Sequence, residues 1–297
     1  MKQDRVIALG FFDGVHLGHA ALLKQCQTLA RQHDCLAGVV TFGTHPEALV
    51  CGRTPALINT PGDREKLLLQ RFSMDHVVTL PFDDALRSMS WQDFADMLCR
   101  DYHAAGFVCG EDFRFGHKGQ GDAALLRQYC SQRDLPFAAV PQQILQGLRI
   151  SSTHIRQLLQ RGAMAEATVF LGHPHILSGK VVHGHQLGRR LGIPTANLRL
   201  PEGLLIPPFG VYACRAIVDG VRYPAVTNIG TRPTVSGEGI TVEPWILNYS
   251  GDLYDREITL EFYDWLRPEE KFPDLQSLQE AIHRDAQKTL ALLDAVP

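Results

Sequence analysis

Short apolar runs alternate with helical patterns through the first half of the chain. The runs that we predict to be strands are residues 5–12, 36–42, 76–80 and 107–110. An amphipathic stretch between the first two carries apolar residues at helical spacing, namely Leu22, Leu23, Cys26, Leu29 and Ala30. This alternation is typical of βαβ units, and it predicts an α/β domain with a mainly parallel sheet covered on both faces. Such sheets bind ligands at the carboxyl ends of their strands.

Beyond about residue 172 the pattern changes to apolar runs separated by turn clusters, with no long helix between them. Ile258, Leu260 and Phe262 alternate with their neighbours, as in a half-buried strand. We predict a compact antiparallel sheet or barrel here, followed by a last amphipathic helix. The apolar face predicted for that helix comprises Leu275, Leu278, Ile282, Ala286 and Leu293. Two domains of different class are therefore expected, at residues 1–172 and 173–297.

The composition of the chain limits which binding partners and which cellular compartment are expected. The 297 residues carry a net charge of −3, which argues against a nucleic-acid partner bound through a broad basic face. The seven cysteines form no C-x-x-C pair, so we predict reduced, packed thiols rather than disulfides or a zinc site. The first apolar run is too short for a signal peptide, and none reaches the roughly 18 residues of a membrane span. We expect a cytoplasmic protein without a membrane partner; its oligomeric state is not indicated.

The segment from residue 10 to residue 19, GFFDGVHLGH, is the first candidate for chemistry. It follows a predicted strand and opens a helix, whose free N–H groups and positive dipole end attract anions. Gly14 and Gly18 let the backbone pass close to a phosphate chain. His16 and His19 can donate hydrogen bonds as charge develops on a leaving pyrophosphate. Ordinary surface histidines are the alternative, which the H-x-G-H spacing after a strand disfavours.

A second cluster, residues 150–156 (ISSTHIR), also stands directly before an apolar helix. Helix capping explains one Ser or Thr there. It does not explain Ser152 and Thr153 together with Arg156 one turn inside the helix. Hydroxyls, amides and a guanidinium at one helix start form a phosphate cradle, so we predict that this cluster holds a triphosphate together with the histidine pair.

The second domain has a glycine-rich, basic stretch of its own between residues 179 and 197. Gly184, Arg189 and Gly192 suit a phosphate-binding flap, although the stretch lacks the G-K-S/T ending of a Walker A motif. A hairpin turn would explain the glycines alone. It would not explain Thr195 and Asn197, two apart on one predicted strand face, whose neutral oxygens suit Mg²⁺ bound with ATP.

The N-terminal motifs are the signature of the H-x-G-H nucleotidyltransferase superfamily. The segment from Gly110 to Gly116, with Asp112, Phe113 and Arg114, further resembles the flavin-nucleotide site of the bacterial bifunctional riboflavin kinase/FAD synthetases. Without that resemblance the segment indicates only a strand followed by a polar turn. The resemblance implies a Rossmann-like nucleotidyltransferase domain with FMN and adenine bound beside this turn.

The resemblance continues through the second domain. The P-T-A-N run at 194–197 is similar to the riboflavin kinase motif, and Asn228, Arg232 and Glu243 follow in the family's order. The resemblance implies an antiparallel β-barrel kinase domain that ends in a helix and uses Mg²⁺ with ATP. It also implies that Glu243 is the base that orients a hydroxyl and accepts its proton. An isolated Glu in a strand is otherwise more often a solvated surface residue.

Three places depart from the family pattern. Residues 43–46 are Gly-Thr-His-Pro where the family often has Asp-Pro-His-Pro, so only His45 is a candidate for a role there. Pro244-Trp245 follows Glu243 where many members have a His two residues on. Because proline cannot donate to a sheet ladder, we expect an edge or a bulge at Pro244. Asp255 stands where a glycine is common.

The resemblance implies two reactions, riboflavin to FMN with ATP, and FMN to FAD with release of pyrophosphate. The expected partners are the small molecules ATP, riboflavin and FMN. A single-function FAD synthetase with an impaired kinase domain is the alternative, because the departures at Pro244-Trp245 and Asp255 lie near the kinase acceptor site. A flavin-binding module without turnover would not need His16, His19, Thr195, Asn197 and Glu243 together.

Overall fold

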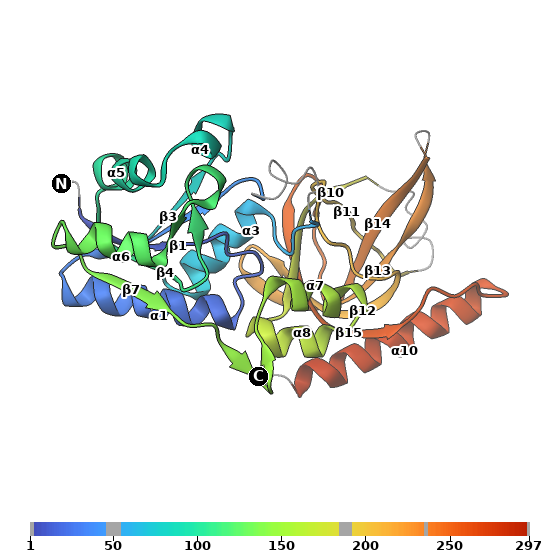
Figure 1. Cartoon of the computed structure of the whole chain (residues 1–297). Coiled ribbons are helices and arrows are strands. Elements are labelled where there is room, and N and C mark those ends of the chain that lie inside the picture. The colour runs from blue at the N-terminus through green and yellow to red at the C-terminus, as the bar shows by residue number, and fades with distance from the viewer. Residues whose placement is uncertain (1–2, 46–54, 184–191, 235–236, 296–297) are drawn as a thin grey trace. The chain divides into compact units, whose positions relative to one another are not determined.

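The protein folds into two compact units, which are described here one at a time. The computed structural model describes residues 3–45, 55–183, 192–234 and 237–295. One unit comprises Met1–Leu57 and Pro61–His154, and the other comprises Ile58–Thr60 and Ile155–Pro297 (Figure 1).

The first unit is built on a five-stranded parallel sheet with the order β3-β2-β1-β4-β7. The strands are β1 (Arg5–Leu9), β2 (Leu36–Phe42), β3 (His76–Leu80), β4 (Ala104–Gly110) and β7 (Phe137–Val140). The predicted parallel sheet is therefore confirmed. The central strands are nearly continuous apolar runs because helices cover both faces of the sheet.

Helices cover this sheet on two sides, with α1 on the face opposite α5 (Figure 1). Helix α1 (Leu17–Gln32) packs against β1, β2 and β4 through the predicted apolar stripe, of which Leu29 is only half-buried. The core of the other face joins Ile7 and Phe107 to Leu98 of α5 (Trp91–Tyr102) and Leu126 of α6 (Ala123–Ser131). The unit's other described elements are α3 (Pro61–Lys66), η1 (Leu67–Arg71), α4 (Asp84–Ser88), β5 (Arg114–Phe115), η2 (His117–Gly119), β6 (Gly121–Asp122), β8 (Ile144–Leu145) and β9 (Leu148–Arg149).

The observed strands correct the predicted ones at three points. Strand β1 ends at Leu9 rather than at residue 12, because Phe12 adopts a left-handed conformation with φ 57°, which no strand accommodates. Strand β4 begins at Ala104, three residues before the predicted start. Strand β7 was not predicted, because its four half-buried residues carry no alternating pattern.

The strand order places a ligand site between β1 and β4. Chain connections run from β1 through β2 to β3 on one side, whereas β4 and β7 lie on the other side. The carboxyl ends of the two strands flanking such a reversal are where open α/β sheets bind ligands. Residues 10–19 follow β1 and residues 111–116 follow β4, so both predicted motifs belong to this position.

The second unit contains a closed six-stranded barrel in the order β10-β11-β14-β13-β12-β15, with every neighbouring pair antiparallel. The strands are β10 (His175–Val182), β11 (Asn197–Arg199), β12 (Gly210–Val218), β13 (Val221–Thr234), β14 (Gly237–Ile246) and β15 (Glu257–Arg267). The predicted antiparallel barrel is confirmed. In β15, Ile258, Leu260 and Phe262 are buried as predicted, but the alternation fails at Glu261, which is also buried and pairs with Arg222.

Helices stand at both chain ends of this unit. Helix α7 (Ser152–Gln160), which begins in the first unit, and α8 (Met164–Leu171) precede the barrel. The predicted last helix is α10 (Leu275–Asp294), which packs on β12 and β13. Its predicted apolar face is correct at Ala286 and Leu293 but wrong at Leu275, which is 59% exposed because it is the first residue of the helix.

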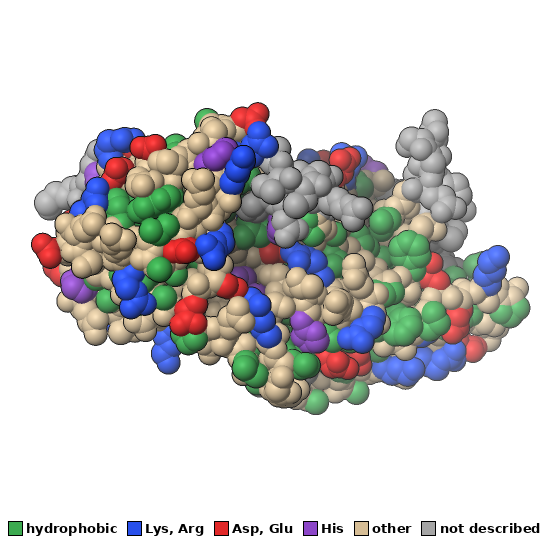
Figure 2. All heavy atoms as spheres, viewed as in Figure 1, with side chains coloured by type: hydrophobic (Ala, Val, Ile, Leu, Met, Phe, Trp, Pro, Cys, Tyr) green, Lys and Arg blue, Asp and Glu red, His purple; other side chains and the backbone are tan. Residues whose placement is uncertain are grey.

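Charged side chains of both signs are interspersed over the face shown in Figure 2, rather than gathered by sign. None of the described helices combines the length and the hydrophobicity that crossing a lipid bilayer requires.

Candidate functional site

The turn between β1 and α1 is folded unusually tightly. Phe12, Gly14 and Val15 all have positive φ, at 57°, 82° and 39°. Gly14 adopts this conformation without steric cost, whereas Phe12 and Val15 do not. Both side chains are buried, which holds the turn in place and delivers the chain to the start of α1 at His16.

His16 and His19 cap the helix reciprocally. The backbone N–H of His19 donates to Nδ1 of His16, and the backbone N–H of His16 donates to Nδ1 of His19, both at 3.3 Å. The two rings stack with centroids 3.6 Å apart and planes at 13°. This is the geometry of a capping box made from two imidazoles. The spacing of three residues therefore serves the backbone as well as any ligand.

The capping fixes the protonation of both rings. Because each Nδ1 accepts a hydrogen bond, the hydrogen of each neutral ring is on Nε2. Burial, together with the charges of His16 and Arg64, holds the pKa of His19 well below its ordinary value. The pair thus carries two Nε2–H groups at a helix N-terminus, an arrangement suited to phosphate oxygens.

The start of α7 joins the same turn, as predicted for residues 150–156. Ser152 Oγ donates to the carbonyl oxygen of Asp13 at 2.9 Å, across 139 residues of sequence. Ser151 Oγ caps the helix by accepting from the N–H of His154 at 3.2 Å. Thr153 is exposed in the first turn, whereas Arg156 is half-buried one turn further on, in the other compact unit. Two helix starts therefore meet at one turn.

Asp112 and Arg114 follow β4 and are each held by a charged partner. Asp112 accepts from Arg149 Nη2 at 2.6 Å and from Gln142 Nε2 at 3.1 Å. Arg114 donates to Asp122 at 3.2 Å, and Asp122 in turn caps α6. The Phe113 ring stacks on Phe115 with centroids 5.5 Å apart. Arg149 was not predicted, because no motif spacing links it to Asp112.

Arg64 is the second residue of this site that the motifs did not indicate. Its guanidinium is completely buried and donates to the carbonyl oxygens of Phe11 at 2.8 Å and Phe42 at 2.6 Å. His45, the candidate in the departing 43–46 segment, packs edge-on against the Phe11 ring at 4.5 Å. The end of β2 is thus tied to the turn after β1.

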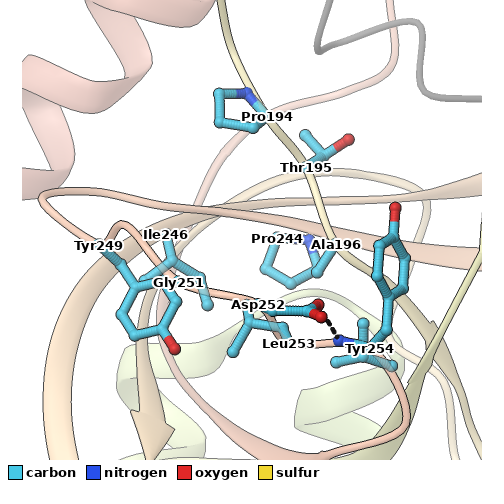
Figure 3. A pocket seen from close by; sticks show the side chains of 11 residues that line it. Pro194, Thr195, Ala196, Pro244, Ile246, Tyr249, Gly251, Asp252, Leu253 and Tyr254 are labelled. Atoms are coloured by element: carbon cyan, nitrogen blue, oxygen red, sulfur yellow. Dashed lines mark hydrogen bonds between the residues drawn. The ribbon is translucent and has the colours of Figure 1, made fainter.

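The second unit contains a cavity of about 560 Å³ at one end of the barrel (Figure 3). Thr195 lines it, together with the apolar side chains of Pro194, Pro244 and Ile246. Tyr249 and Tyr254 stand on the loop that closes the other side. A cavity lined by aromatic and apolar side chains, with the Thr195 hydroxyl and the Asp252 carboxylate also in its wall, suits a nucleobase and its sugar.

Asn197, Glu243 and Asn228 form one row across three neighbouring strands. Asn228 is the register partner of Glu243 in the β13–β14 ladder. Leu198 pairs with Val242, so the antiparallel register extended by one residue sets Asn197 opposite Glu243 on its other side. Residues directly opposite in antiparallel strands share a face. The Glu243 carboxylate therefore lies between the amides of Asn228 and Asn197 on one face of the sheet.

The predicted pairing of Thr195 and Asn197 on one strand needs correction. Strand β11 begins at Asn197, so Thr195 lies in the segment before it, where the N–H of Ala196 donates to the Pro244 carbonyl at 2.9 Å. Thr195 lines the cavity, whereas Asn197 begins the row with Glu243.

Of the other residues predicted for this site, the structure describes some and leaves the rest undescribed. Gly192 is exposed, with a left-handed φ of 71°. Asn228 Nδ2 makes a long hydrogen bond of 3.5 Å to Glu269 Oε1. Gly184 and Arg189 lie outside the described residues, as does the side chain of Arg232.

The family departures near Glu243 have local explanations. Pro244 stays in regular register opposite Thr227 without a recorded shift, so a bulge is not found there. Trp245 packs edge-on against His283 of α10, with centroids 5.7 Å apart. Asp255 has a left-handed φ of 63° and pairs with Lys180 Nζ at 2.9 Å. A glycine would adopt that conformation without steric cost.

Comparison with known proteins identifies both halves of the chain. Residues 1–154 match the family model described as FAD synthetase, and residues 171–293 match the one described as riboflavin kinase. Bifunctional riboflavin kinase/FMN adenylyltransferase of Listeria monocytogenes is 34% identical, over 97% of this chain and 92% of the relative. The protein of the same description from Escherichia coli strain K12 is 37% identical, over 96% and 91%.

A solved structure gives the same result for the whole fold. A protein from Streptococcus pneumoniae, described as a macrolide-efflux protein, matches with a TM-score of 0.85 and 30% identity, over 98% of this chain and 95% of that one. Together with the two family models and the relatives, this match leaves one assignment. The chain belongs to the family of bifunctional riboflavin kinase/FMN adenylyltransferases.

Proposed function

We propose that this protein is a bifunctional transferase that phosphorylates riboflavin to FMN with ATP and then adenylylates FMN to FAD. The observation that carries the proposal is the occurrence of two phosphate-directed sites, one in each compact unit. One is the His16–His19 pair at the sheet reversal, and the other comprises the row around Glu243 and the cavity of the barrel unit. We propose residues 1–172 and 173–297 as the corresponding domains.

In adenylyl transfer, a phosphate oxygen of FMN attacks the α-phosphorus of ATP, and the bond to the bridging oxygen of pyrophosphate breaks. Negative charge moves onto the leaving pyrophosphate. The Nε2–H groups of His16 and His19 donate to it, and the amides at the start of α1 add the positive end of the helix dipole. Gly14 and Gly18 admit the phosphates to the backbone.

The start of α7 supports the same step from the opposite side. Ser152 is anchored to the turn through Asp13, and Thr153 is exposed beside it. Arg156, one turn further along α7, is proposed as a further charged donor to phosphate. Asp112, Phe113 and Arg114 border the flavin nucleotide, because β4 is the neighbour of β1 at the reversal.

In the kinase reaction, the terminal hydroxyl of the ribityl chain attacks the γ-phosphorus of ATP, and ADP leaves. Glu243 orients that hydroxyl and accepts its proton, while Asn228 flanks it in the row. The adenosine part of ATP occupies the 560 Å³ cavity. Gly184, Arg189, Gly192 and Arg232 complete this phosphate site.

The oxygen donors near this site fit a magnesium ion that arrives with ATP. Mg²⁺ prefers one or two protein oxygens together with substrate phosphates. Thr195 at the cavity edge and Asn197 in the row offer such neutral oxygens. Among the described residues there is no cluster of three or more His, Cys, Asp or Glu side chains that would hold a metal without substrate. When bound, Mg²⁺ neutralises charge that develops on the phosphates.

We further propose that the enzyme works in the cytoplasm on ATP, riboflavin and FMN, without nucleic-acid or membrane partners. The described cysteines support a reducing compartment, since all six are free thiols. A fractionation experiment that found the protein with an envelope fraction would contradict this location.

Product analysis by chromatography tests the two activities. Wild-type protein incubated with riboflavin, ATP and Mg²⁺ should form FMN and then FAD. Glu243→Gln should form no FMN from riboflavin and still convert added FMN to FAD. His19→Ala should form FMN and lose FAD synthesis by about 10²–10³-fold, as for removal of one transition-state donor. A wild-type protein that makes FAD from FMN but never FMN from riboflavin is instead a single-function FAD synthetase.

A further inference from the structure

Among the described residues of the first unit, Arg64 is the most deeply buried charged side chain, with 0% exposure. It stands on the short helix α3, which carries none of the motifs assigned above. A buried guanidinium is costly unless every donor that points inward is satisfied. Its position therefore needs an explanation from what it holds.

The guanidinium joins the carboxyl ends of two neighbouring strands. Nη1 donates to the Phe11 carbonyl, which also accepts from Thr41 Oγ1 at 2.8 Å. Nη2 donates to the Phe42 carbonyl at the end of β2. The guanidinium also lies 4.5 Å from the centre of the Phe11 ring. Arg64 thus clamps the residue that immediately precedes the left-handed turn.

That turn stores backbone strain which must be held by its surroundings. Phe12 and Val15 have φ of 57° and 39°, in the left-handed region where a side chain strains the backbone. The turn leads directly into His16, the N-cap of α1. A shift of the turn therefore moves the histidine pair with it.

The charge of Arg64 acts on the same pair. Burial lowers the pKa of Arg64 to about 10, and the charge of Asp13 opposes that shift, so the guanidinium stays charged at neutral pH. Three factors lower the pKa of His19: burial contributes most, followed by the charge of His16 and then the charge of Arg64. A proton added to either Nδ1 would break the reciprocal capping bonds. A fixed cation at this place disfavours that proton.

We propose that Arg64 is a positioning residue for adenylyl transfer: it clamps the turn after β1 and keeps His16 and His19 as the Nε2–H tautomer. The inference rests on the proposed adenylyl transfer at residues 10–19. It assigns Arg64 no contact with ATP or FMN. The effect on the reaction passes through the Phe11 carbonyl and the histidine rings.

Two variants separate the clamp from the charge. Arg64→Met removes both, and should lower kcat/KM for FAD formation from FMN by about 10²-fold, as expected for a misplaced donor pair. It should also move the acid limb of the kcat/KM profile to higher pH. Arg64→Lys keeps a charge but cannot donate to both carbonyls in one plane, so the rate should fall while the acid limb stays.

Arg5→Met is the matched control in the same unit. Arg5 Nη1 donates to the Tyr102 carbonyl at 3.0 Å, at the amino end of β1, away from the turn. This variant should lower the unfolding midpoint and leave the acid limb unchanged. Riboflavin kinase activity, measured in the same samples, should stay at the wild-type level in all three variants.

Nitrogen NMR of the histidine rings gives a readout without turnover. His16 and His19 should show Nε2–H signals in wild type, and His19 should take up a second proton at higher pH in Arg64→Met. Unchanged histidine titration and an unchanged acid limb in Arg64→Met would overturn the inference. If Arg64→Met does not fold, a wild-type kcat/KM in Arg64→Lys overturns it equally. Wild-type protein that makes no FAD from FMN would refute the proposed function instead.

Discussion

Asp255 combines a left-handed backbone conformation with an ion pair to the barrel. Asp255 sits at φ 63°, directly after Tyr254 of the cavity loop, and its carboxylate bonds Lys180 on β10. Lys180 holds the pKa of that carboxyl below its ordinary value. Asp is among the few non-glycine residues that tolerate this conformation. The ion pair thus fastens the loop to the barrel at this position.

We predict that Asp255→Gly leaves both the urea midpoint of the second unit and the kinase kcat unchanged. The glycine removes backbone strain, which compensates for the loss of an exposed ion pair. Asp255→Ala, which loses the pair and keeps the strain, should lower the midpoint. Urea titration by fluorescence together with FMN formation checks both variants. A kinase defect in Asp255→Gly would show that the carboxylate takes part in the reaction.

His175 is a buried imidazole whose ring nitrogens find no hydrogen-bond partner within the described part of the chain. Its side chain is 1% exposed on β10, near the ring of Phe262. Burial, and secondarily the charge of His173, lowers the pKa of His175 to about 3. The folded state therefore keeps this ring neutral.

This burial makes the second unit sensitive to acid. The pKa of His175 is about 6.5 in the unfolded chain and about 3 when folded, so its contribution is complete above pH 6.5 and is lost as the pH falls toward 3. We predict a loss of about 2 kcal/mol in free energy of unfolding between pH 7.5 and pH 5. His175→Phe should remove that part of the pH dependence in urea titrations, whereas His283→Gln, at an exposed position, should not. Identical pH slopes in His175→Phe and wild type would contradict the prediction.

At the scale of elements, α10 is attached to the barrel by a nearly buried ion pair. Arg267 Nε donates to Asp285 at 2.9 Å, with side-chain exposures of 16% and 3%. Arg267 ends β15, and the Glu269 that follows lies against Asn228 and Gly230. The pair therefore holds both the last helix and one border of the Glu243 row.

We predict that Asp285→Ala lowers the free energy of unfolding by about 3–5 kcal/mol, because it leaves a buried guanidinium without its partner. Leu275→Ala, on the same helix but 59% exposed, should change it by no more than about 0.5 kcal/mol. Thermal or urea unfolding of the full chain measures both. Equal effects of the two substitutions would mean that α10 is not anchored through Arg267.

The pattern of apolar residues predicts which elements form more accurately than it predicts where each element begins and ends. Strands β2 and β3 have the predicted bounds, because uninterrupted apolar runs end at turn residues there. The end of β1 was wrong, because the left-handed Phe12 depends on burial and on the Arg64 clamp rather than on local propensity. Leu275 was misplaced, because periodicity does not reveal that the first turn of α10 extends beyond the barrel.

For the candidate sites too, residues that belong to local sequence motifs were predicted, whereas residues that act over long sequence distances were missed. The bond from Ser152 to the Asp13 carbonyl brings the start of α7 to the turn after β1, whereas the predicted binding of a triphosphate there stays a prediction. Arg64 and Arg149 were missed because each acts on atoms distant in sequence, and no spacing rule connects them. The specific roles of the other site residues stay predictions until the variants are measured.

At the scale of the whole molecule, the chain places two different phosphorus chemistries in two separately built units. In the proposed reactions, the parallel sheet offers helix starts and histidine donors to the pyrophosphate that leaves ATP, whereas the barrel offers a carboxylate between amides to an acceptor hydroxyl. Neither reaction needs a covalent link between enzyme and flavin. FMN is therefore a product that can leave one site before it enters the other.

This independence predicts complementation between two inactive chains. Glu243→Gln should lack the kinase step and His19→Ala the adenylylation step, so neither alone should make FAD from riboflavin. A mixture should make FAD after a lag, because FMN released by the His19→Ala chain becomes substrate for the Glu243→Gln chain. Dilution of the mixture should lengthen the lag before FAD appears. The lag of wild-type enzyme at the same dilutions serves as the reference. Accumulation of FMN without FAD in the mixture would show that FMN passes between sites only within one assembly.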